Sequence, residues 1–210
     1  GGYIDLGAYE SSYNSPLSAD NNGIIYVKTA VFGNGSGKSW DNATADLQGA
    51  INATDVQKVF VANGNYNAPV TSFVMKNNVA IYGSFDPDNN IKTLSDTRVY
   101  PSLAVNGSVL NGQNTHRVIH NNFTEILPLN TTAILDGFTI TNGNSTFGSG
   151  MYNIYASPTL RNLVIKNNTA TASGGGIATE YASPTLTNVI ISGNNATNPS
   201  GSARGGGMYN

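Results

Sequence analysis

The chain has 210 residues, of which 10% are charged and 39% are hydrophobic, and its formal net charge is −2. With 10 Lys and Arg against 12 Asp and Glu, it offers no basic surface for nucleic acid, and no apolar run approaches the roughly 18 residues of a membrane span. The chain has no Cys, which excludes disulfides, thiolate zinc sites and a thiol nucleophile.

The first predicted element is a single strand near the N-terminus, where Ile4, Leu6 and Ala8 alternate with polar residues and glycine. A polar linker follows, so residues 1–22 are assigned to a separate segment. This segment either ends a preceding unit or serves as a donor strand for a neighbouring copy. Because the chain starts at Gly1, we expect a processed product or a fragment of a longer protein.

Residues 40–52 are predicted to form a short amphipathic helix, with Asp41 or Thr44 as its N-cap. The residues expected on its apolar face are Trp40, Leu47, Ala50 and Ile51. A helix placed before the first coil would cover an open sheet edge, so we interpret it as an N-terminal cap.

Strand-like segments continue at residues 59–62, 79–82 and 118–119. The loop after the second of them contains Asp86, Asp88 and Asn90, whose oxygens have a spacing typical of calcium ligands. The same residue types are typical of tight turns. We therefore assign no metal site and keep this loop as a weak calcium candidate.

Two histidines also come under consideration as ligands. His116 and His120 lie four residues apart, and a strand would place both on one face. The sequence supplies no evident third ligand or matched carboxylate. We therefore assign them no role.

The second half of the chain repeats, most clearly over residues 135–210. LDGFTITNGN at 135–144 recurs as LRNLVIKNNT at 160–169 and as LTNVIISGNN at 186–195, which are offsets of 25 and 26 residues. Ala-Ser-Pro-Thr-Leu and a glycine-rich motif recur in the same phase. Self-similarity at this period is typical of solenoids.

These repeats predict an all-β protein, a right-handed parallel β-helix with a short N-terminal capping helix over residues 23–210. Leu135, Leu160 and Leu186 would form one inward column, and a second column is expected at Ile140, Ile165 and Ile191. Asn and Gly clusters follow each Ile, at corners that require positive φ. Stacked Asn amides are expected to hydrogen-bond from coil to coil.

Outward positions offer few catalytic groups. Asp136 is expected beside Arg161 in one outward column, as a structural ion pair worth about 1 kcal/mol or less. Tyr152 and Tyr209 share a column that Ala178 interrupts, so a continuous aromatic platform for sugars is not predicted. No acidic cluster is evident in the aligned repeats, so no catalytic residue is assigned.

The motifs resemble those of polymorphic outer membrane proteins and of right-handed parallel β-helix repeat proteins of bacterial surfaces. The similarity rests on Gly-Gly-Gly followed by Ile or Met and on residues 40–51, 81–86 and 135–143, and it covers most of residues 23–210. Residues 4–10 resemble the strand that usually closes such domains. The resemblance implies secretion and a role in cell-surface adhesion or scaffolding.

We therefore predict a non-enzymatic, extracellular structural or adhesive module of a cell-surface fibre, without a cofactor. Its expected partners are copies of itself or adjacent tandem units, bound head to tail through exposed strand edges. The predicted self-association residues are Ile4, Leu6, Ala8, Met208 and Tyr209. The alternative function is a carbohydrate-binding or polysaccharide-degrading β-helix that takes surface glycans.

Overall fold

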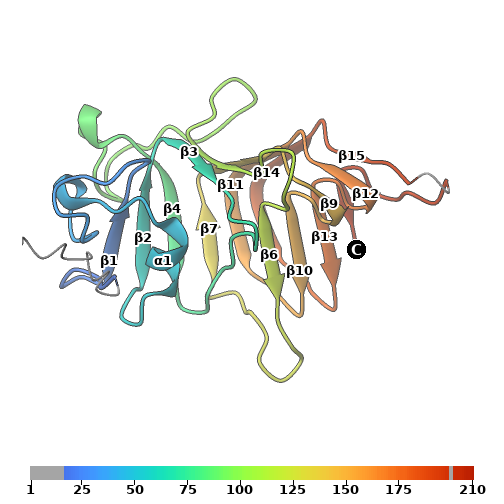
Figure 1. Ribbon diagram of the computed structural model, residues 1–210, viewed down its shortest axis with the longest axis horizontal. Helices are drawn as coiled ribbons and strands as arrows, with labels where there is room; N and C mark the ends of the chain where they lie inside the picture. The colour runs from blue at the N-terminus through green and yellow to red at the C-terminus, as the bar shows by residue number, and fades with distance from the viewer. Residues whose placement is uncertain (1–16, 199–200) are drawn as a thin grey trace, which may run out of the picture.

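The chain winds into successive coils that follow one another along the long axis of the molecule (Figure 1). The computed structural model describes residues 17–198 and 201–210. Every pair of named strands in these ranges is parallel, and no helix there is long and apolar enough to cross a membrane. The predicted parallel β-helix is confirmed.

The first wall of the solenoid pairs β1, β2, β4, β7, β11 and β14 in that order. Their bounds are β1 Ile24–Val27, β2 Lys58–Ala62, β4 Ala80–Phe85, β7 Ile134–Asp136, β11 Thr159–Lys166 and β14 Thr185–Ser192. Registered residues form an inward column of Ile25, Val59, Ile81, Leu135, Leu160 and Leu186. The predicted leucine column is therefore confirmed, and it extends back to β1.

The second wall contains shorter strands and the C-terminal halves of β11 and β14. Its other strands are β3 Gly64–Asn67, β5 Ser108–Asn111 and β8 Phe138–Thr141. The inward column here is Tyr66, Leu110, Ile140, Ile165 and Ile191. The corner between the two walls falls at Gly137, Asn162 and Asn188, which all have positive φ, a conformation that Gly and Asn tolerate best.

The third wall pairs in the order β16, β13, β10 and β6. These strands are β6 Ile119–Asn122, β10 Met151–Ile154, β13 Ile177–Glu180 and β16 Met208–Tyr209. Three short strands precede this wall in successive coils, namely β9 Asn144–Phe147, β12 Thr169–Ser173 and β15 Asn195–Ala196. The inward residues of the three walls enclose one continuous core.

Asparagine side chains link neighbouring coils at the corners. Asn168 Nδ2 donates to Asn194 Oδ1 at 2.9 Å, and Asn188 Nδ2 donates to Asn162 Oδ1 at 2.8 Å. The corner after the second wall also has positive φ at Asn142, Asn167 and Gly193. The predicted amide ladders and the predicted use of Asn and Gly at corners are confirmed.

Residues 40–52 do not form the single helix that the amphipathic pattern predicts. A 3-10 turn η1 spans Trp40–Asn42 and helix α1 spans only Leu47–Asn52. The N-cap is Asp46, whose Oδ1 accepts the Gly49 N–H at 2.8 Å, so the prediction of Asp41 or Thr44 as the cap is wrong. The interruption arises because Thr44 pairs with Val27 of β1.

The N-terminal edge of the first wall is thus covered by extended backbone instead of by the helix. Lys28 N–H donates to Thr44 O at 3.0 Å, and Thr44 N–H donates to Tyr26 O at 3.1 Å. Helix α1 instead lies at the start of the third wall. Gln48 exchanges two hydrogen bonds with the backbone of Val74, and the adjacent Phe73 pairs with Ile119 of β6.

A second apolar cluster lies outside the solenoid, on the outer face of the first wall. The ring centroids of Phe60 and Phe85 are 4.5 Å apart, and those of Trp40 and Phe85 are 5.5 Å apart. The indole N–H of Trp40 donates to Lys92 O at 3.0 Å. Lys92 belongs to the insertion of residues 86–107, which begins with the 3-10 turn η2 Pro87–Asn89 and covers this face.

Candidate functional site

The C-terminal coil presents the solenoid interior at an edge. Within the described residues β14 pairs only with β11, β15 only with β12 and β16 only with β13. The inward residues Leu186, Val189 and Ile191 are only partly buried, whereas their counterparts in β11 are at most 1% exposed. Such an edge combines apolar side chains with backbone groups that can pair with a further parallel coil.

The predicted self-association residues divide between the two ends of the chain. Met208 and Tyr209 form β16 at this open edge, where Met208 is 38% exposed and lies opposite Ile177. The other three, Ile4, Leu6 and Ala8, lie outside the described residues.

Aromatic rings stack along the outer side of the third wall. His120 and Tyr152 are stacked with centroids 5.7 Å apart and an interplanar angle of 4°, and Ala178 and Tyr209 follow in register. The predicted interruption of this column at Ala178 is confirmed. Because the rings face one another along the solenoid axis, their faces are used for stacking and do not form an outward platform for sugars.

A second stack was missed by the sequence reasoning. The rings of Tyr155 and Tyr181 are 4.8 Å apart at 13°, and Tyr181 is 72% exposed. Both residues have positive φ, 46° and 51°, a conformation that is uncommon for bulky side chains. The signal was present, because a Tyr precedes both copies of Ala-Ser-Pro-Thr-Leu.

Charged groups surround the first stack. The Arg117 guanidinium lies 5.0 Å from the Tyr152 ring centroid and donates to Phe147 O at 2.9 and 3.0 Å. The Tyr152 hydroxyl donates to Glu180 Oε2 at 2.6 Å. Burial, together with Glu180, raises the pKa of Tyr152 to about 12. Burial and the charge of Arg117 lower the pKa of His120, so His120 is neutral at pH 7.

The two histidines do not share a strand face. Strand β6 begins at Ile119, whereas His116 belongs to the preceding turn, in which its N–H donates to Gly112 O at 2.9 Å. The prediction of a common face for His116 and His120 is therefore wrong, because the strand starts later than the sequence pattern indicated.

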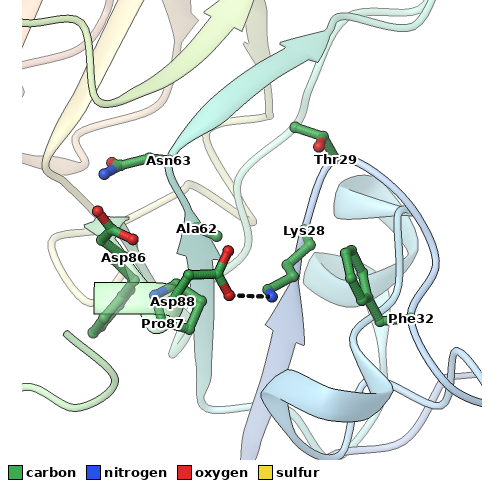
Figure 2. A pocket seen from close by; sticks show the side chains of 9 residues that line it. Lys28, Thr29, Phe32, Ala62, Asn63, Asp86, Pro87 and Asp88 are labelled. Carbon is green, nitrogen blue, oxygen red and sulfur yellow. Dashed lines mark hydrogen bonds and ion pairs between the residues drawn. The ribbon is translucent and has the colours of Figure 1, made fainter. Parts of the chain in front are cut away.

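The calcium candidate lies beside a small cavity of about 130 Å³ (Figure 2). Asp88 Oδ1 lies 3.3 Å from Lys28 Nζ, and Asp86 Oδ2 accepts from Asn89 Nδ2 at 2.9 Å. Asn90 ends the turn in the left-handed conformation. Both carboxylates thus already have partners, and one partner is a cation. Among the described residues, no group of three His, Cys, Asp or Glu side chains could hold a metal ion.

Asp136 has more partners than the sequence predicts. Its pair with Arg161 is confirmed at 3.2 Å, but Arg98 from the insertion lies at 3.5 Å and Asn162 donates to it at 3.0 Å. The side chains of Asp136 and Arg98 are each 6% exposed. The insertion covers Asp136 although Arg161 is 37% exposed, and the carboxylate is held in place instead of being free for acid or base chemistry.

A family model described as "Protein of unknown function (DUF1565)" matches residues 32–208. No curated protein and no solved structure matches the chain. The matched range includes the insertion and every strand of the solenoid except β1 and the last residue of β16.

Proposed function

The chain belongs to the DUF1565 family, and we propose that it is a non-enzymatic structural and adhesive β-helix module of an extracellular fibre. The observation that carries this proposal is the stacking of parallel coils on registered apolar columns, along which Leu135, Leu160 and Leu186 occupy equivalent positions. A parallel coil of the same kind, from a second copy or an adjacent tandem unit, would extend the sheets and cover these columns.

Two further features support assembly by stacking. Tyr181 stacks on Tyr155 and leaves its other face exposed toward the open edge, so a further ring could continue the stack. The low charge content supports repetition along an axis, because like charges in successive coils would lie about 4.8 Å apart and repel one another.

Three of the carboxylates on the outer side of the solenoid have structural partners. Asp136 is held by Arg98 and Arg161, Asp88 pairs with Lys28, and Glu180 accepts from Tyr152. This engagement favours a scaffold over a hydrolase or lyase. The cell-surface location rests on the resemblance of the repeats to those of bacterial surface proteins.

The proposal is tested by placing a charge in the inward column at the open edge. Val189→Lys should convert concentration-dependent oligomers into monomers in sedimentation velocity, because a buried ammonium between two coils would be unpaired. Val70→Lys is the matched control, since Val70 is 81% exposed in a loop. Circular dichroism checks that both variants fold.

A wild-type chain that stays monomeric at every concentration, or a Val189→Lys chain that assembles like wild type, would contradict the proposal. Deletion of residues 1–12 tests which segment pairs with the edge of β14. If residues 4–10 act as the predicted donor strand, their loss abolishes assembly as Val189→Lys does.

A further inference from the structure

A polar groove of about 530 Å³ lies on the outer side of the second wall. Its volume is in the range of ligand sites, roughly 300–1,000 Å³. The lining comes from β3, β5, the end of β8, the end of β11 and the last residues of the insertion. The residues that the argument uses are Asn65, Asn106, Val109, Asn111, Asn142 and Lys166.

One side of the groove is a row of carboxamides that runs along the solenoid axis. Asn111 Nδ2 donates to Asn65 Oδ1 at 2.9 Å, and Asn142 Nδ2 donates to Asn111 Oδ1 at 3.2 Å. A carboxamide has two N–H donors, and within the described residues Asn111 and Asn142 each use one of them here. The second N–H of each remains available, so the row presents repeated donors to a ligand that lies along it.

The far end of the groove carries a cation. Lys166 Nζ donates to Asn106 Oδ1 at 2.9 Å, and no carboxylate of the described residues lies within ion-pair distance of it. The groove therefore combines neutral donors with one uncompensated positive charge.

The rest of the lining consists of Gly64, Gly107, Thr141 and Asn167. Gly64 and Gly107 have no side chains, and Val109 offers an apolar surface between Asn65 and the second-wall strand β8. A uronic acid unit presents hydroxyl groups, an apolar ring face of C–H groups, and a carboxylate. One cation and a formal net charge of −2 do not fit a phosphate polymer, which requires several basic contacts.

We propose that this groove binds an acidic oligosaccharide, with a uronate carboxylate at Lys166 and sugar hydroxyls on the row formed by Asn65, Asn111 and Asn142. The site goes beyond the proposed scaffold role, since it lies on the side of the solenoid and does not involve the open edge. An adhesive module would then have one surface for assembly and another for a glycan.

The proposal is tested by isothermal titration calorimetry with a short oligogalacturonate and with a neutral oligogalactoside of equal length. Wild-type protein should bind the acidic ligand more tightly, and added salt should weaken that binding. Lys166→Gln keeps a hydrogen-bond donor but removes the charge. The affinity for oligogalacturonate should fall about tenfold or more, as expected for loss of a hydrogen bond to a charged group. The affinity for the neutral ligand should stay unchanged.

Lys38→Gln is the matched control, because Lys38 is exposed in a loop outside the groove. Asn65→Ala should lower the affinity for both ligands, since it removes one amide from the row. Absence of oligogalacturonate binding by the wild type, or equal binding by Lys166→Gln, would overturn the proposal. Val189→Lys should still bind the glycan as a monomer, which separates failure of this site from failure of the assembly proposal.

Discussion

Asn168 is the corner residue whose replacement gives the clearest test of the amide ladders. It is fully buried and links three coils. Its Oδ1 accepts the Gly143 N–H at 2.8 Å, and its Nδ2 donates to Ile140 O at 3.2 Å and to Asn194 Oδ1 at 2.9 Å. Asn168→Ala removes all of these bonds without changing the backbone of the corner.

The expected loss of stability follows from those contacts. A buried N–H left without a partner, here that of Gly143, costs about 1–3 kcal/mol, and each further hydrogen bond lost costs about 1 kcal/mol. We therefore expect Asn168→Ala to lower the free energy of unfolding by about 3–5 kcal/mol. That is a large part of the roughly 5–15 kcal/mol typical of a domain.

The assay is urea unfolding at equilibrium followed by far-ultraviolet circular dichroism. A lower midpoint with an unchanged slope reports a change in stability. The control is Asn195→Ala, because Asn195 belongs to the same corner but is exposed, and this variant should stay within about 0.5 kcal/mol of wild type. A loss below about 1 kcal/mol for Asn168→Ala, or equal losses for both variants, would refute the ladder as a source of stability.

Two further predictions concern charged and titrating groups. Asp136→Ala leaves the buried Arg98 without its carboxylate, so it should lower the free energy of unfolding by about 3–5 kcal/mol. Asp88→Ala removes a side chain that is 85% exposed, so it should cost less than about 1 kcal/mol in the same urea assay. Similar losses for the two variants would disprove a buried network. Burial lowers the pKa of His120. As the pH drops below about 6.5, the His120 imidazole therefore takes up a proton in the unfolded chain before it does so in the folded chain. The free energy of unfolding should fall as the pH approaches the folded-state pKa. His120→Gln should reduce that fall in midpoints measured at several pH values, and an unchanged pH profile would exclude His120 as its source.

Most of the solenoid could be predicted from its repeats. A strand that slips by one residue exposes its whole apolar set, so the spacing of Leu135, Leu160 and Leu186 determines both strand register and inward face. The Asn and Gly residues that follow are determined locally, since few other residues tolerate positive φ. The same local reasoning fails at residues 40–52, where an amphipathic pattern competes with the pairing of Thr44 to the edge of β1.

The contacts at the candidate sites do not follow from the repeat period of the sequence. The insertion carries Arg98 to Asp136 and Asn106 to Lys166, and neither pairing follows from the spacing of these residues along the chain. The stack of Tyr155 on Tyr181 could have been predicted, because both tyrosines precede the same motif.

The coil, its columns and its corners follow from the repeats, because these features recur and each copy reinforces the same register. Which side chains the irregular segments bring together depends on packing across the fold. An insertion has no neighbouring copy to align it, so its position is set by the surface that it covers. The buried aspartate network and the amide groove with its single cation are both products of that packing.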